Sequence, residues 1–177
     1  MFRRLGEKQR TKNEMASKES TIFLETLINA PILVVFDCAR SIDVHQLSTA
    51  KTKEKAVAGR MSGLCELGDE VTWRAKHFGF YQTLSSRITK LKAPFYFQDC
   101  MLKGAFSFLI HDHFFEEKYG VTTMKDVFVY GVPYGVFGKY FDRLVLKKYM
   151  TSFLTERNRV IKELAELTLS KKFEDEY

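Results

Sequence analysis

The residues with the most evident chemistry form the tripeptide His111-Asp112-His113. Successive side chains of a β-strand point to opposite faces, so His111 and His113 share one face and Asp112 lies on the other. Two histidines spaced in this way supply half of a zinc site, which needs a third ligand such as His77 from another strand. A histidine pair on the outer, solvated face of a sheet needs no metal, and we favour this interpretation. The sequence therefore predicts no metal site.

Three further side chains are candidates for proton transfer, namely His77, Asp99 and Asp126. Burial in an apolar cavity would lower the pKa of His77 and make it a general base or a hydrogen-bond acceptor. The same geometry describes a core histidine with satisfied hydrogen bonds, which we favour. A carboxylate that faces a cavity could orient a ligand hydroxyl or abstract a proton. Because alternation alone does not show which face points inward, Asp99 and Asp126 are equally compatible with solvent, and no catalytic residue is assigned.

Motifs of the common enzyme classes are absent. There is no GxSxG, no HExxH and no dinucleotide-binding fingerprint. The segment Gly135–Lys139 lacks the hydroxyl residue and the glycine spacing of a phosphate-binding loop. The segment Lys103–Phe108 reverses the residue order of an RNA-binding aromatic strand. We therefore expect no cofactor and no nucleic-acid partner.

The composition is that of one globular domain. Of 177 residues, 45% are hydrophobic and 28% are charged. The longest apolar run, Ala30–Phe36, is far shorter than the roughly 20 residues that span a bilayer. The three cysteines, Cys38, Cys65 and Cys100, are widely spaced and odd in number, which does not fit a disulfide framework. They indicate a reducing compartment, and we expect a cytoplasmic protein.

The formal net charge of +6 does not form one continuous basic face. Residues 1–19 carry six cations against three glutamates, and residues 134–169 carry seven cations against four carboxylates. The first 19 residues lack the apolar core of a secretory signal, so we expect a disordered basic leader. Met15 is an alternative start, and the sequence leaves open whether residues 1–14 belong to the native protein.

The elements that must position these side chains follow from turn signals and periodicity. Residues 20–30 are rich in β-formers, Pro31 begins a short helix that ends near Arg40, and Ser41 caps a second helix that ends at Ser48. A short strand is expected within residues 56–62. Turn signals then divide an aromatic-rich region into an antiparallel meander. Its expected strands are 70–78, 81–91, 95–103, 106–117 and 121–131.

The spacing of apolar residues along the chain changes after residue 133. Apolar residues recur three, four or seven positions apart from Phe137 to Leu164, with cations between them, which predicts one long amphipathic helix over residues 134–168. Its apolar stripe must pack against the aromatic sheet. Residues 169–177 are expected to form a flexible charged tail, which leaves residues 20–168 as a single domain.

This layout resembles the SRPBCC superfamily of START-type, birch-pollen-allergen-like and polyketide cyclase/dehydrase-like proteins, in particular its small stand-alone bacterial branch. The segments that carry the resemblance are Ala30–Phe36, Gly68–Trp73, His111–Phe115 and Pro133–Gly138. The resemblance covers residues 20–168. It implies an α+β helix-grip fold, in which a curved antiparallel sheet of about seven strands wraps around the long C-terminal helix, with two short helices after the first strand.

A cavity between the sheet and that helix implies two functional hypotheses. The first is the binding or transport of an apolar small molecule or lipid, without catalysis. The second is a cyclase or dehydratase that uses His77 with Asp99 or Asp126 for proton transfer. Transient contact of the basic helix face and the leader with an anionic membrane would deliver an apolar ligand. The residues expected to line the cavity are Trp73, His77, Phe97, Phe108, Phe128 and Phe141.

Overall fold

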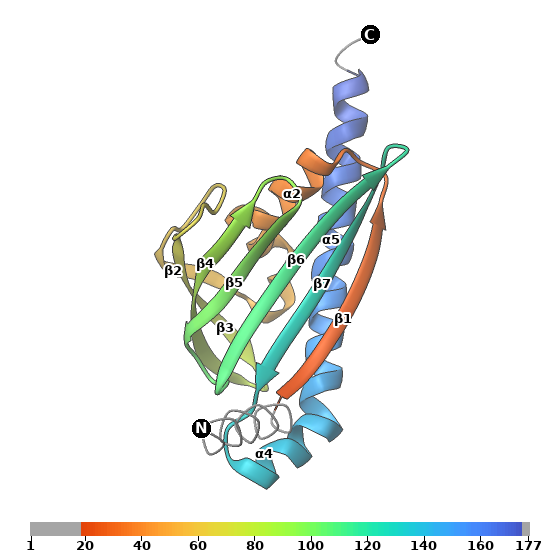
Figure 1. Cartoon of the computed structure of the whole chain (residues 1–177). Coiled ribbons are helices and arrows are strands. Elements are labelled where there is room, and N and C mark those ends of the chain that lie inside the picture. Colours follow the sequence, from red (N-terminus) through yellow and green to blue (C-terminus); the bar gives the residue numbers. More distant parts are fainter. Residues whose placement is uncertain (1–18, 175–177) are drawn as a thin grey trace, which may run out of the picture.

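A long C-terminal helix lies across one face of a single antiparallel sheet in the computed structural model, which describes residues 19–174 and their side chains as far as residue 168. Figure 1 shows the curved sheet with the helix running along its inner face. The expected leader lies outside the described residues except for Glu19, which begins the first strand. The end of the expected tail, residues 175–177, lies outside them as well.

The seven strands pair in the order β1-β7-β6-β5-β4-β3-β2, and each neighbouring pair is antiparallel. Every strand expected from the sequence is present, which confirms the meander and the first strand. The strands are β1 (Glu19–Ile28), β2 (Lys55–Gly59), β3 (Glu70–His77), β4 (Phe80–Lys92), β5 (Tyr96–Lys103), β6 (Phe108–Lys118) and β7 (Val121–Gly131).

Two tight hairpins keep the meander in register. The β3–β4 turn is formed by Phe78 and Gly79, and the β6–β7 turn by Tyr119 and Gly120. All four residues have positive φ, between 51° and 86°, as two-residue turns of the I′ type require. The resulting register sets Asp99 of β5 opposite His111 of β6. It also sets His113 of β6 opposite Asp126 of β7.

Two short helices follow β1. The first, α2 (Ile32–Arg40), begins directly after Pro31. Its neighbour α3 (Ile42–Ser48) is capped by the Ser41 hydroxyl, which accepts a hydrogen bond from the Val44 amide at 3.2 Å. A 3₁₀ turn at Ala50–Thr52 leads to β2. Both helices contact the C-terminal helix, and α2 also contacts β6 and β7, so they close one end of the space between sheet and helix.

The C-terminal helix is less regular than its sequence pattern predicts. It consists of α4 (Gly135–Phe141), a π-helical segment (Asp142–Leu146) and α5 (Lys147–Glu174). Asp142 in the π-helical segment is buried and accepts hydrogen bonds from Tyr130 at 2.6 Å and from Ser20. The irregular turn therefore lies where the helix is tied to β1 and β7.

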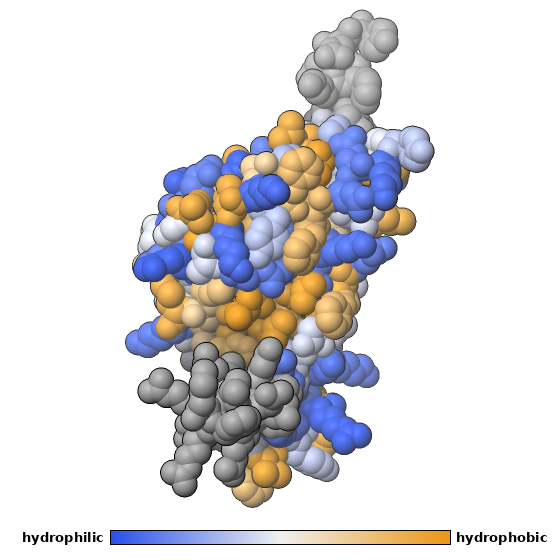
Figure 2. Space-filling model, viewed as in Figure 1, coloured by the Kyte–Doolittle hydropathy of each residue, from blue (hydrophilic) through white to orange (hydrophobic). Residues whose placement is uncertain are grey.

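The two faces of the sheet differ in character. The inner face carries most of the core, including Phe97, Phe115 and Phe128, which are each at most 4% exposed. Figure 2 shows the outer face, where hydrophilic side chains are interrupted by a band of hydrophobic ones. Within residues 19–174, no helix combines the length and apolar character that crossing a bilayer requires. The buried side chains that could form an internal site therefore lie on the inner face.

Candidate ligand cavity

A cavity of about 340 Å³ lies between the inner face of the sheet and the C-terminal helix. The sheet contributes aromatic walls such as Trp73 and Phe97, and α5 contributes Met150 and Leu154. These side chains are each at most 8% exposed, so they belong to the core as well as to the cavity. The space exists because the curved sheet diverges from a straight helix, and the side chains between them do not fill it.

Five of the six residues expected to line this cavity do line it. The exception is Phe108, which points to the outer face of β6 and covers the backbone of Gly131, its partner on β7. Phe106, which precedes the strand, lines the cavity instead. Inward alternation on β6 passes through Leu109, so Phe108 is excluded from the inner face. The five residues are Trp73, His77, Phe97, Phe128 and Phe141.

The same alternation brings His111 and His113 into the protein. The expectation of a solvated outer-face pair is wrong, because the two histidines are 6% and 1% exposed and line the cavity. Asp112 points outward, where it accepts hydrogen bonds from Tyr96 and Gln98. The choice of inward face on β6 thus decides the position of Phe108 and of both histidines together.

Asp126 lies behind the two histidines and binds both. Its Oδ1 is 2.9 Å from His111 Nε2 in a hydrogen bond, and 2.9 Å from His113 Nδ1 in an ion-pair contact that lacks hydrogen-bond alignment. On its other side, Asn158 donates to Asp126 Oδ2 at 2.6 Å. Arg157 lies 3.6 Å from Oδ1 and donates to the Ala39 carbonyl at 3.1 Å. A completely buried carboxylate is therefore compensated from both the sheet and α5.

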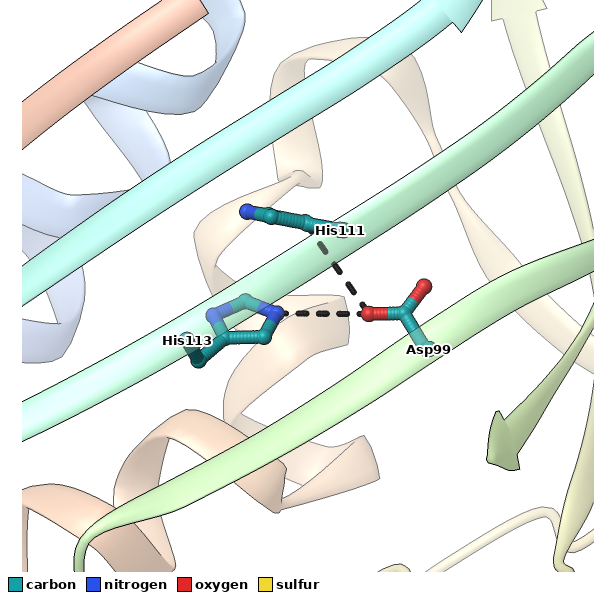
Figure 3. A group of neighbouring side chains, drawn as sticks. All are labelled: Asp99, His111 and His113. Carbon is teal, nitrogen blue, oxygen red and sulfur yellow. Dashed lines mark hydrogen bonds and ion pairs between the residues drawn. The ribbon is translucent and has the colours of Figure 1, made fainter. Parts of the chain in front are cut away.

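Asp99 lies on the opposite side of the histidines. Figure 3 shows its carboxylate directed toward both rings. Asp99 Oδ2 is 3.2 Å from His113 Nε2 and 4.0 Å from His111 Nδ1. Its side chain keeps 23% exposure and lines the cavity. Asp99 is therefore the most exposed member of this group.

Burial and neighbouring charges change the pKa values of this group. Burial lowers the pKa of His111 to about 4, and His113 beside it acts in the same direction. Burial opposes charge on His113 too, but the carboxylates of Asp126 and Asp99 outweigh it and raise the pKa of His113. Burial would raise the pKa of both carboxyl groups, whereas the histidines lower it, most strongly for Asp126. Both aspartates are therefore held as carboxylates.

His77 belongs to a different part of the cavity. Its Nδ1 shares a hydrogen bond of 2.8 Å with the Tyr149 hydroxyl on α5, and its ring contacts Phe153 edge-on. Burial lowers the pKa of His77. The hydrogen bond matches the favoured interpretation of a satisfied core histidine.

The cyclase-type hypothesis required two titratable groups at the cavity. Asp99 and His113 meet that requirement, because both line the cavity and they form a hydrogen bond of 3.2 Å. His77 is bonded to Tyr149 instead, and Asp126 is 1% exposed behind the histidines. His77 and Asp99 of the expected pair both line the cavity, but the partner that Asp99 hydrogen-bonds is His113, and catalysis itself stays a prediction.

Sequence reasoning placed Arg157 on the basic face of the helix and assigned Asn158 to no site, so it missed both as partners of Asp126. A signal was present, because both interrupt the buried stripe of α5 at helical spacing. Asn158 follows Met150 and Leu154 in steps of four, and Ile161 and Ala165 continue the stripe. Polar residues at such positions need buried partners.

Apolar side chains surround the opening of the cavity near α4. Phe78, Tyr134 and Phe141 line the cavity and are also 45%, 85% and 44% exposed. Phe78 contacts Phe141 edge-on at 5.8 Å between ring centroids, so the β3–β4 turn meets α4 here. This end of the cavity is therefore bordered by exposed aromatic rings.

Comparison with known proteins identifies the fold. No family model matches the chain, and no curated protein sequence is significantly similar to it. Solved structures are similar, however. A protein of unknown function, SA2116 from Staphylococcus aureus, has a TM-score of 0.68 and 11% identity, with 86% of this chain and 97% of that chain covered.

Two other structures from distant organisms show the same arrangement. The protein TTHA0849 from Thermus thermophilus has a TM-score of 0.64 and 16% identity, over 80% of this chain and 97% of that chain. Major latex-like protein 151 from Panax ginseng has a TM-score of 0.62 and 12% identity, over 83% of this chain and 97% of that chain. At these identities the likeness concerns the fold. It confirms the α+β helix-grip fold that the resemblance to the SRPBCC superfamily implied.

Proposed function

We propose that this protein binds one hydrophobic small molecule or lipid in the cavity between the sheet and α5. The observation that supports this proposal is the cavity itself, whose volume of about 340 Å³ is in the range of small-molecule sites. Its walls are largely apolar, and polar groups gather at Asp99, His111 and His113. Burial of apolar ligand surface, worth roughly 25 cal/mol per Å², supplies the affinity, and the polar group orients the ligand.

Exposed apolar residues at the opening support a membrane as the source of such a ligand. In α4, Val136, Phe137 and Tyr140 are 80%, 86% and 68% exposed. Arg143 and Lys147 follow directly on exposed positions. Exposed aromatic residues beside cations are typical of helices that lie in the interface of anionic membranes. We therefore place the docking surface at α4, rather than along the whole helix.

The rest of the expected basic helix face supports docking less well. Arg157 is 4% exposed and contacts Asp126, so it belongs to the interior. Arg159 is paired with Glu156 and Glu163, and Lys162 donates to the Leu27 carbonyl. The cations beside the exposed aromatic side chains of α4 are therefore the ones that this proposal uses.

The three cysteines support a reducing compartment. All of them are free, Cys65 is buried, and Cys38 and Cys100 are partly buried. Burial raises the pKa of Cys65 to about 11, which keeps it a thiol near neutral pH. We therefore propose that the protein is located in the cytoplasm, where cysteine thiols are kept reduced.

The test combines native mass spectrometry with a fluorescent probe. Protein purified without detergent is expected to carry a bound apolar molecule, or to bind N-phenyl-1-naphthylamine at one site with an increase in fluorescence. Ala75→Phe places a ring inside the cavity wall, whereas Lys76→Phe places it on the outer face of the same strand. Ala75→Phe should weaken probe binding at least 10-fold and Lys76→Phe should not. Equal binding by both folded variants, without any bound molecule, would overturn the proposal.

A further inference from the structure

The two ring nitrogens of His111 face the same pair of carboxylates, Asp126 and Asp99, as the two ring nitrogens of His113. Each ring presents one nitrogen to Asp126 Oδ1, at 2.9 Å in both cases. Each ring thereby turns its other nitrogen toward Asp99 Oδ2, at 4.0 Å for His111 Nδ1 and 3.2 Å for His113 Nε2. One carboxylate thus contacts both rings, and the second carboxylate lies where the remaining nitrogens converge.

This arrangement gathers electron pairs at one point. A neutral imidazole has one donor and one acceptor nitrogen, and His111 Nε2, which forms the hydrogen bond to Asp126, is the donor of its ring. His111 Nδ1, which faces Asp99, is then an acceptor, whereas His113 Nε2 carries the proton of its hydrogen bond to Asp99 Oδ2. A metal ion that replaces the proton of His113 Nε2 would meet three electron pairs at this point, from Asp99, His111 and His113. The two carboxylates of Asp99 and Asp126 outweigh the single guanidinium of Arg157 beside them, so the region favours such a cation.

The distances suit a metal ion. The three ligand atoms of Asp99, His111 and His113 all lie within 4.8 Å of one another. Metal–ligand bonds of about 2.1 Å at tetrahedral or octahedral angles separate neighbouring ligand atoms by about 3.0 to 3.5 Å. The 3.2 Å contact already has this length, and the 4.0 Å contact of Asp99 with His111 must shorten by about 0.5 to 1 Å. Rotation of the partly exposed Asp99 side chain can shorten its own distances, and rotation of the two imidazole rings must adjust the separation of the histidine nitrogens.

We propose that Asp99, His111 and His113 bind one divalent transition-metal ion, with its remaining coordination positions open to the cavity. Two histidines and one carboxylate with open positions are a donor set that suits Fe²⁺, Co²⁺ or Zn²⁺. Asp126 acts as the outer carboxylate that orients metal-bound histidines, and Asn158 holds it at 2.6 Å. All three ligand residues line the cavity, so a bound molecule could contact the metal. The proposed metal site does not depend on which apolar molecule the cavity binds.

The experiment uses the full chain after removal of metals with a chelator. Titration with Co²⁺ under anaerobic conditions should give visible absorption bands that saturate at one ion per chain, and added Zn²⁺ should abolish them. Asp99→Asn and His113→Gln should weaken Co²⁺ binding by more than about 100-fold. Asp126→Asn should weaken it by about 10- to 100-fold, as is typical when the partner of a metal-bound histidine is lost.

A matched control separates this site from other histidine and carboxylate pairs. His45 lies 3.3 Å from the carboxylate of Glu54, outside the group around Asp99. His45→Gln should therefore leave Co²⁺ affinity within about twofold of the wild-type value. Circular dichroism shows which variants are folded. The absence of saturable Co²⁺ binding, or equal affinity in folded Asp99→Asn, would overturn the proposal.

One measurement on the wild-type protein avoids the question of variant folding. X-ray absorption of the Co²⁺- or Zn²⁺-loaded chain should show two imidazole ligands together with oxygen ligands. A spectrum with sulfur ligands or without imidazole would place the ion elsewhere and overturn the proposal. Probe binding to the cavity is measured separately, so failure of metal binding does not affect the result for the apolar ligand.

Discussion

Asn158 on α5 donates a hydrogen bond of 2.6 Å to Asp126 on β7, in the interior between helix and sheet. Asn158 also reaches Thr26 of β1 at 3.3 Å. The bond to Asp126 connects the long helix to the group of histidines at the cavity. A change in Asp126 should therefore affect stability as well as any binding at His111 and His113.

Replacement of Asp126 by asparagine should destabilise the protein strongly. The variant keeps the side-chain volume but removes the carboxylate that lies 3.6 Å from the buried Arg157, and loss of one charged partner inside a protein costs about 3 to 5 kcal/mol. Urea unfolding followed by circular dichroism measures the change. The control is Glu25→Gln, which removes an exposed ion pair with Lys125 on the neighbouring strands and should cost at most about 1 kcal/mol. Equal effects of both variants would contradict this account of Asp126.

Tyr130→Phe should loosen the junction of the sheet with the π-helical segment. The Tyr130 hydroxyl is buried and donates to Asp142 at 2.6 Å, so its removal leaves a buried carboxylate with one partner fewer. We expect a loss of about 1.5 to 3 kcal/mol in the free energy of unfolding. Tyr119→Phe, at a fully exposed hairpin position, is the control and should be neutral. An unchanged unfolding midpoint for Tyr130→Phe would show that this bond contributes little.

The stability contributed by His77 should depend on pH. Burial lowers its pKa in the folded state below the ordinary value of 6.5, so the unfolded chain takes up a proton first as the pH falls. The free energy of unfolding therefore falls as the pH drops below about 6.5, until the folded-state pKa is reached. His77→Gln can still bond to Tyr149 but has no charge to gain. Its unfolding free energy should change less between pH 7.5 and pH 5.5 than that of the wild type, and an equal or larger change would refute this role.

Membrane association should depend on the exposed side chains of α4. The double variant Phe137→Ser, Tyr140→Ser removes two rings that are 86% and 68% exposed. Flotation with vesicles of phosphatidylserine and phosphatidylcholine should show at least a threefold smaller bound fraction than for the wild type. Phe23→Ser removes a ring that is 71% exposed on β1 and should not change flotation. Binding that persists in the double variant would remove α4 from the docking proposal.

The element order could be read from the sequence because local signals agreed with one another. Pro31 begins a helix, Ser41 caps the next one, and Gly79 and Gly120 lie in the tight turns that join long strands. Each signal acts within a few residues, so no tertiary contact was needed to interpret it. The π-helical segment at Asp142 was not foreseen, because it coincides with hydrogen bonds from Ser20 and Tyr130, which are distant in the sequence.

Local sequence patterns were enough to specify the strands, the two short helices, the order of the elements and which side chains share a strand face: Phe97 with Asp99, His111 with His113, and Asp126 with Phe128. They did not specify which of the two faces points inward, and that depends on the packing of the folded chain. Either face of β6 could point inward with the same alternation of side chains. A register shift of one position would move Phe108 into the cavity and both histidines out of it. Packing against α5 selects the inward face, because Asp126 finds Asn158 and Arg157 there. Buried polar side chains require such partners, and these two lie far from Asp126 along the chain, where no local pattern can reveal them.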